Sequence, residues 1–210
     1  IKYLYHKITY STMKLKITSI LMLALVAIFS FSAFKPKADV YTVDVAKSTI
    51  NWEGKKFSGT HTGTVNLTSG NLQFNGKKLV EGGFVADMTT IKTMDGEKPS
   101  PNLDKHLKND DFFGVEKFPA ANFVIKKVEG NGADVKITGD LTIKGKTNSV
   151  TFPAKITWNA DKTVTAVAEK VTVDRTKYGI EYKSKSIFSS IGDNFIYDEF
   201  TFAVKLVAKK

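Results

Sequence analysis

From Val40 onward, apolar and polar residues alternate along most of the chain. The segment DVKITGDLTI (134–143) places Val135, Ile137, Leu141 and Ile143 on one face and polar residues on the other. NSVTFPAKITW (148–158) and EFTFAVKLVA (199–208) repeat the same pattern. A period of two over this length predicts half-buried antiparallel strands.

Counting such segments gives about eight strands. The nine candidate segments are 41–45, 49–54, 62–67 or its neighbour 71–74, 79–89, 121–128, 134–143, 148–158, 163–174 and 199–208. Turn-forming residues are found at 68–71, 75–78, 129–134, 144–148 and 159–162. With no helical repeat and no linker dividing the chain, the pattern predicts an all-β domain, either a closed barrel or a sandwich.

Two long segments interrupt the alternation, at 92–119 and at 174–198. The first predicts a short helix near 103–111, with Asn102 as its N-cap and with Leu103 and Leu107 on one face. Both segments are rich in aromatic and aliphatic residues. Long loops of this kind over a β scaffold usually cover or line an opening.

The interior of an eight-stranded barrel can be filled by side chains or can hold one small ligand. Small residues occupy several positions predicted to point inward: Gly63, Gly83, Ala86, Gly139, Ala154, Ala166 and Ala168. They indicate either room for a ligand or adaptation to the taper of a filled barrel. The alternation does not distinguish the two.

The N-terminal region predicts export. Residues 1–12 precede the first methionine, Met13, and we interpret them as upstream or non-native sequence. Residues 13–38 have the layout of a signal peptide: Lys14 and Lys16, then an apolar run, then small residues. The run from 17 to 31 is short for a membrane-spanning helix. We therefore expect translation to start at Met13, and residues 39–210 to form a single periplasmic domain after the signal peptide is removed.

Composition narrows the classes of function. The net charge is +10, but the lysines are spread along the chain, which argues against nucleic acid as a partner. The chain contains no cysteine, so neither a disulfide nor a lipid attached to cysteine is expected.

Few residues in the chain are candidates for catalysis or for metal binding. Asp104, His106, Asp110 and Asp111, with His61, are the candidate metal ligands, but their spacing lacks the ordered pairs of a metal motif. No nucleophile motif is present, so we expect no catalytic residue, no metal and no enzyme activity. Arg175, the single arginine, predicts either an ion pair with Asp174 or Asp193 or a contact with a ligand head group.

Three elements together resemble the YceI-like family of exported lipid-binding proteins. They are DKHLKNDDFFGVEKFPAANFVI (104–125), GDLTIKGKTNSVTFPAKI (139–156) and DRTKYGI followed by IGDNF (174–195). The resemblance covers 40–206. It implies an eight-stranded, lipocalin-like antiparallel barrel with a short helix beside it, enclosing a tunnel for a polyisoprenoid or another amphiphilic chain.

The resemblance also suggests where a ligand would lie. Many relatives carry an Arg-Asp pair where this chain has Leu103 and Asp104, and the missing charge favours a neutral or quinone-like head over a pyrophosphate. Leu103, Leu107, Phe112 and Phe113 are expected to turn toward the barrel as a lid. The residues expected to contact the ligand are Trp52, His61, Phe84, Met88, His106, Leu107, Phe112, Phe113, Phe123, Arg175, Tyr178 and Phe195.

The leading functional prediction is a carrier or sequestering protein for an isoprenoid, quinone or fatty amphiphile. It would need no other cofactor, could touch membrane surfaces transiently through its lysines, and would be a monomer or a homodimer. One alternative is a barrel with a filled core, serving as a structural or stress-related module with a metal at His106. Another is an outer-membrane barrel, in which the apolar face would point outward.

Overall fold

A computed structural model describes residues 37–95 and 98–210. The predicted upstream segment, 1–12, and residues 13–36 of the predicted signal peptide lie outside the described residues. Within the described residues, no helix combines the length and apolar character needed to span a membrane.

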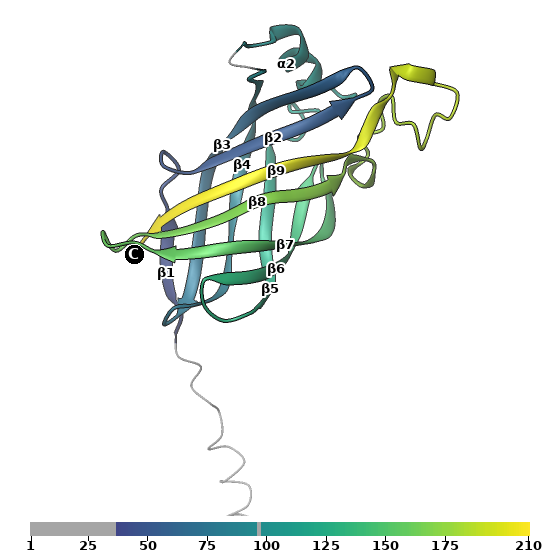
Figure 1. The fold of residues 1–210 in the computed structure, drawn as a ribbon. Coiled ribbons are helices and arrows are strands. Elements are labelled where there is room, and N and C mark those ends of the chain that lie inside the picture. Colours follow the sequence, from purple (N-terminus) through teal and green to yellow (C-terminus); the bar gives the residue numbers. More distant parts are fainter. Residues whose placement is uncertain (1–36, 96–97) are drawn as a thin grey trace, which may run out of the picture. The chain divides into compact units, whose positions relative to one another are not determined.

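The domain is a single antiparallel sheet that closes on itself (Figure 1). The described residues contain nine strands, in the order β1-β3-β2-β9-β8-β7-β6-β5-β4, and the β3–β4 pairing closes the ring. The strands are β1 (Asp39–Val43), β2 (Thr49–Lys56), β3 (Gly59–Asn75), β4 (Lys78–Thr93), β5 (Ala120–Glu129), β6 (Asp134–Ile143), β7 (Lys146–Trp158), β8 (Val164–Asp174) and β9 (Ile196–Lys209).

Strands β1 and β2 share one position in the ring, because β1 pairs with the end of β3 and β2 pairs with its beginning. The barrel therefore has eight strand positions, which confirms the predicted closed barrel over the sandwich. In β6 the residues at 135, 137, 139, 141 and 143 are all buried, so the apolar face points inward. That orientation is the reverse of the one expected for an outer-membrane barrel.

The turn predicted at 68–71 is wrong. These residues lie inside β3, whose pairing with β4 shifts register between Leu67 and Ser69. A shift of this kind lets a strand bend without ending, which explains why a Ser-Gly-Asn sequence interrupts the pattern here without forming a turn. The other four predicted turns do connect consecutive strands.

One end of the barrel is closed by an aromatic plug formed by Tyr41, Phe74 and Trp158. Their ring centroids lie 5.4 Å (Tyr41–Phe74), 5.6 Å (Tyr41–Trp158) and 5.0 Å (Phe74–Trp158) apart in edge-on arrangements. Phe74 is fully buried. Aromatic pairs in this geometry stabilise beyond their buried area, so these three rings pack firmly against one another at this end.

The short helix α2 (Pro101–Lys108) lies at the other end of the barrel (Figure 1). It begins earlier than predicted, with Ser100 in place of Asn102 as its N-cap. Asp104 Oδ1 accepts hydrogen bonds from the backbone N–H and the hydroxyl of Thr93, at 2.6 and 2.8 Å. These bonds fix the helix to the end of β4.

Arg175 holds the second irregular segment, which contains the 3-10 turns η1 (Arg175–Tyr178) and η2 (Gly192–Asn194). The guanidinium donates to the backbone carbonyls of Tyr197 (3.0 Å), Ile180 (2.8 Å) and Ile196 (2.9 Å). It also pairs with Asp198 at 3.5 Å. The predicted pairing with Asp174 or Asp193 is therefore wrong, and Asp174 instead caps η1 by accepting from the N–H of Thr176.

Asp198 and Asp95 make hydrogen bonds in the irregular segments, and the pKa of each carboxyl is lowered. For Asp198, desolvation opposes ionisation, but hydrogen bonds from Ser184 and Ser186 and the charge of Arg175 outweigh it and lower the pKa. For Asp95, the hydrogen bond with the His61 ring is the main cause of the lowered pKa. A folded pKa below the unfolded value stabilises the fold at neutral pH, and this contribution is lost as pH falls.

Acidification is therefore expected to destabilise the end of the barrel that carries α2. Below the ordinary carboxyl pKa of 3.8, the melting temperature should fall as Asp198 and Asp95 become protonated. Asp198→Asn should lower the melting temperature at neutral pH and make its decline below about pH 4 shallower. Asp134→Asn, at an exposed position of β6, is the control. An unchanged acid profile in Asp198→Asn would contradict this account.

Gly139 provides a test of packing inside the barrel. A Cβ at this position would lie 2.4 Å from Phe123 Cζ and 2.6 Å from the backbone oxygen of Val124. Gly139→Ala should therefore destabilise the domain by about 1–3 kcal/mol, measured by urea denaturation. Gly54→Ala is the matched control, because a Cβ there would lie 4.0 Å from its nearest neighbour, Trp52 Cζ3, and it should change stability by less than about 1 kcal/mol.

Candidate functional site: an apolar tunnel in the barrel

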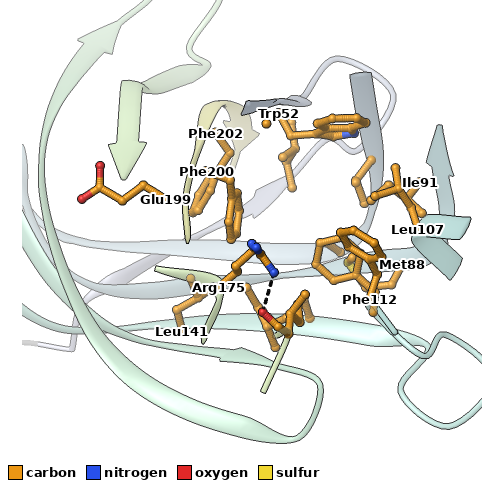
Figure 2. A pocket seen from close by; sticks show the side chains of 18 of the residues that line it. Trp52, Met88, Ile91, Leu107, Phe112, Leu141, Arg175, Glu199, Phe200 and Phe202 are labelled. Carbon is orange, nitrogen blue, oxygen red and sulfur yellow. Dashed lines mark hydrogen bonds between the residues drawn. The ribbon is translucent and has the colours of Figure 1, made fainter. Parts of the chain in front are cut away.

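The barrel encloses a cavity of about 130 Å³ on the side of α2. Its wall is almost entirely apolar and comes from β2, β3, β4, β5, β6 and β9, together with the two irregular segments. Figure 2 shows several of these side chains converging on the cavity, including Trp52, Met88 and Phe112. We call this space the lumen.

A wider cavity of about 360 Å³, here called the mouth, adjoins the lumen on the side of α2. Trp52, Leu107 and Phe112 line both spaces. The mouth is more polar than the lumen. Its wall also includes Phe57, His61, Leu103, His106, Tyr182 and Phe195, and three lysines, Lys55, Lys56 and Lys183.

A small cavity of about 40 Å³ lies deeper in the barrel and shares Phe84 with the lumen. Phe84 and Phe123 face each other there, with ring centroids 5.5 Å apart. The ring of Phe123 also occupies the space beside Gly139, and the indole of Trp52 occupies the space beside Gly63. At these two positions the small residues make room for a neighbouring ring and not for a ligand. This agrees with the alternative that small residues adapt to the taper of the barrel.

The segment after α2 forms the partition between mouth and lumen. Leu107 and Phe112 are buried, Phe113 lines the lumen and Leu103 lines the mouth, so all four residues of the expected lid face the barrel. His106 is in edge contact with Phe112 and Tyr182, at centroid distances of 4.8 and 4.7 Å. The histidine thus packs as part of an aromatic cluster.

Each histidine of the mouth has one carboxylate partner. His61 Nδ1 lies 2.5 Å from Asp95 Oδ2, and His106 Nε2 lies 3.6 Å from Asp111 Oδ2. In the part of the chain that the structure describes, no three His, Cys, Asp or Glu side chains gather closely enough to hold a metal ion.

The residues predicted to contact the ligand fall into four groups. Those that line the lumen are Trp52, Phe84, Met88, Leu107, Phe112, Phe113 and Arg175. His61, His106 and Phe195 lie in the mouth, and Phe123 lies in the deep cavity. Tyr178 lies in the core, outside the walls of these three spaces, where burial raises the pKa of its hydroxyl to about 12.

Sequence reasoning missed several residues of the wall. Phe200 and Phe202 of β9 line the lumen, and the alternation in 199–208 already placed them on the inward face. Ile180 and Ile196 line the lumen and Tyr182 lines the mouth. All three come from the segment 174–198, which the sequence predicted to cover or line an opening, but no periodicity there indicates which side chains point inward. Arg175 donates to the carbonyls of Ile180 and Ile196 and so fixes the backbone at these two residues.

Among the described residues that line the lumen, Arg175 is the one charged residue that is buried, with less than a tenth of its surface exposed. Desolvation lowers the pKa of its guanidinium, and the neighbouring charges of Asp198 and Asp174 counteract this effect. Figure 2 shows the guanidinium reaching into the lumen, whereas the carboxylate of Glu199 points away from it. A wall of this kind can bury an apolar chain.

Comparison with known proteins supports the fold and the family. The model of the YceI-like domain matches residues 41–208. A UPF0312 protein from Shewanella denitrificans is 38% identical over 104 residues, which are 47% of this chain and 54% of the relative. Protein YceI from Escherichia coli is 40% identical over 72 residues, 34% of this chain and 38% of that protein. The chain spans about half the length of the curated relatives it matches.

Solved structures show the same architecture. Burkholderia cenocepacia BcnA matches with a TM-score of 0.65 and 24% identity, covering 80% of this chain and 99% of that one. A polyisoprenoid binding domain from Saccharophagus degradans, implicated in plant cell wall breakdown, matches with a TM-score of 0.61 and 14% identity, covering 80% and 97%. At these identities the likeness establishes the fold. Because the family model spans nearly all of the barrel, the chain belongs to the YceI-like family.

Proposed function

We propose that the protein is an exported carrier or sequestering protein that holds an isoprenoid, quinone or fatty chain in its lumen. The observation that carries this proposal is the apolar lumen, which shares Trp52, Leu107 and Phe112 with the mouth and lies on the side of the barrel away from the aromatic plug. The polyisoprenoid binding domain that shares this fold supports the same class of ligand. Export rests on the signal-peptide layout of residues 13–38.

The size of the cavities limits how a chain can bind. The lumen, about 130 Å³, is similar to cavities of about 150 Å³ that accept a benzene molecule, so it accommodates about six carbons. Burying six methylenes contributes ~5 kcal/mol before the costs of association, which gives only weak binding. A tightly held chain must therefore also occupy the mouth, or enter the deep cavity by moving Phe84 and Phe123.

The rim of the mouth suits an amphiphile. Lys55, Lys56 and Lys183 lie where a ligand head would emerge. They would also favour transient contact with an anionic membrane surface, where a carrier could exchange its ligand. The lumen wall requires no covalent chemistry for this role, so we propose that the protein is a binding protein without enzyme activity.

The proposal predicts that filling the lumen abolishes ligand binding. Ala121 lines the lumen and its neighbour Ala120 is exposed on the outer face of β5. Ala121→Phe should reduce co-purifying or added isoprenoid and quinone lipids at least tenfold, measured by native mass spectrometry after detergent-free purification. Ala120→Phe should bind as the unaltered protein does.

Two results would contradict the proposal. One is an unaltered protein that neither carries nor takes up such lipids, as expected for the alternative of a filled structural barrel. The other is equal lipid occupancy in Ala121→Phe and Ala120→Phe.

Phe112 lies between the lumen and the mouth. Its removal should therefore lower the stability of the fold and also change the rate at which bound lipid leaves the lumen. Phe112→Ala should cost about 3–5 kcal/mol in the free energy of unfolding, since the residue is buried and contacts His106 and Tyr182. It should also speed the release of bound lipid to acceptor vesicles. Phe118→Ala, at a half-buried position outside the walls of the three cavities, is the control. Unchanged stability and release in Phe112→Ala would show that this residue is not a partition.

A further inference from the structure

Exposed apolar side chains gather at the end of the barrel that carries the mouth. Phe57 lies in the turn between β2 and β3, and slightly more than half of its surface is exposed. Ile187, Phe188 and Tyr197, which come from the second irregular segment and the start of β9, are each almost half exposed. Single exposed apolar residues are common on soluble proteins, but a contiguous group of them marks an interaction site.

The aromatic members of this group are in contact through one buried ring. Phe195 lies between Phe57 and Tyr197, with its ring centroid 5.7 Å from that of Phe57 and 5.0 Å from that of Tyr197. The backbone N–H of Phe57 donates to the carbonyl of Phe195 at 3.1 Å, which ties the β2–β3 turn to the residue before β9. Because Phe57 and Phe195 also line the mouth, the exposed rings are continuous with its wall.

The loop that carries Ile187 and Phe188 begins beside the same strand. Ser184 forms a bridge with Ile196, and the backbone N–H of Phe188 donates to the carbonyl of Ser184 at 2.9 Å. Figure 1 shows this loop and the β2–β3 turn at the same end of the barrel as α2. The exposed apolar residues thus belong to one surface beside the mouth.

Lysines border this apolar surface. They are Lys55, Lys56, Lys183 and Lys185. The Nζ atom of Lys185 lies 4.6 Å from the ring centroid of Phe195. Among the described residues, Asp193 is the one carboxylate in the wall of the mouth, and Lys55 is the one lysine of the four in an ion pair, with Glu53 at 3.2 Å. Positive charge therefore exceeds negative charge at this rim.

We propose that this surface, here called the docking face, binds an anionic lipid bilayer and turns the mouth toward it. The docking face consists of Phe57, Ile187, Phe188 and Tyr197 together with Lys55, Lys56, Lys183 and Lys185. Its apolar side chains bury in the boundary between head groups and acyl chains, while its lysines are attracted to anionic head groups. The inference rests on the proposed function and names the surface through which the ligand enters. A chain that moves from the docked bilayer into the mouth does not have to cross water.

A bilayer suits the docking face better than a protein partner does. Protein–protein interfaces are depleted in lysine and enriched in arginine. The docking face instead carries four lysines, and the single arginine of the chain, Arg175, is buried. Apolar rings beside lysines are typical of surfaces that lie in a membrane interface, because the long lysine side chain keeps its charge at the level of the head groups.

Sedimentation with vesicles tests the docking face. Residues 38–210 form one compact unit that contains the whole closed sheet, so the barrel can be produced without the apolar segment 17–31, which would itself bind lipid. The barrel is mixed with vesicles of phosphatidylcholine alone, or of phosphatidylcholine and phosphatidylglycerol in equal amounts. It should bind the anionic vesicles about tenfold more tightly, and this preference should fall as the salt concentration rises.

The apolar part of the docking face is tested by Phe188→Ser. This variant removes an exposed ring and should weaken binding to the anionic vesicles about tenfold, since a phenylalanine that enters the bilayer gains the free energy of burial. The matched control is Val124→Ser, because Val124 is 48% exposed on the outer face of β5 and Phe188 is 49% exposed. The control should bind as the unaltered barrel does, and thermal melts verify that both variants fold.

The charged part is tested by the double variant Lys183→Glu with Lys185→Glu, which should abolish the preference for anionic vesicles. Its matched control is Lys77→Glu with Lys78→Glu, two exposed positions in the turn between β3 and β4, near the aromatic plug. The two double variants have the same net charge. The control should therefore retain the preference if the position of the lysines, and not the total charge, determines binding.

Lipid occupancy of the same preparations, measured by native mass spectrometry, separates this inference from the proposed function. A barrel that holds isoprenoid or quinone lipid but binds neither kind of vesicle overturns the docking face and leaves the proposed function standing. A barrel that binds anionic vesicles but takes up no such lipid overturns the proposed function, while the docking face stands as a membrane-binding surface.

Two further results would overturn the docking face. One is an equal loss of vesicle binding in the controls and in the docking-face variants. The other is a dimer that Phe188→Ser dissociates, in a barrel that leaves the vesicles unbound, because the occupant of the surface would then be a second copy of the chain. A loss of vesicle binding confined to the docking-face variants supports the inference.

Discussion

Closure of one antiparallel sheet is the constraint on which the rest of the structure depends. Once β3 pairs with β4, every second side chain of the ring points into a space that must be filled by side chains or by a ligand. At one end Tyr41, Phe74 and Trp158 fill it with edge-packed rings. Toward α2 the packing is incomplete, and the lumen is the result.

The open end depends on a few polar contacts that orient irregular backbone. Asp104 fixes α2 to β4 through Thr93, and Arg175 binds three carbonyls of the segment that ends at β9. These contacts hold the backbone so that Phe112, Ile180 and other apolar side chains point into the lumen. The same arginine that organises the fold is also part of the lumen wall, with its guanidinium bonded to backbone carbonyls and to Asp198.

Part of the site could be predicted because it lies on periodic strands or on the motif after α2. Trp52 and Met88 follow the alternation, and Phe112 follows from the aromatic run after the helix. Tyr178 shows where this reasoning fails, because an aromatic residue in a loop can pack into the core as readily as it can line an opening. Tyr182 and Ile196 lie in a segment predicted to cover or line an opening, but their direction could not be predicted, since it is set by contacts distant in sequence.

The sequence by itself determined the all-β class, the number of strand positions and the apolar inner face, because alternation with a period of two is a local property of the chain. Only the tertiary structure decided that the ring closes through β3 and β4, that the turn-like residues 68–71 continue a strand, and that Arg175 pairs with Asp198. It also decided how much of the lumen stays open. Whether a glycine leaves a gap depends on which ring lies across from it, as Phe123 does at Gly139.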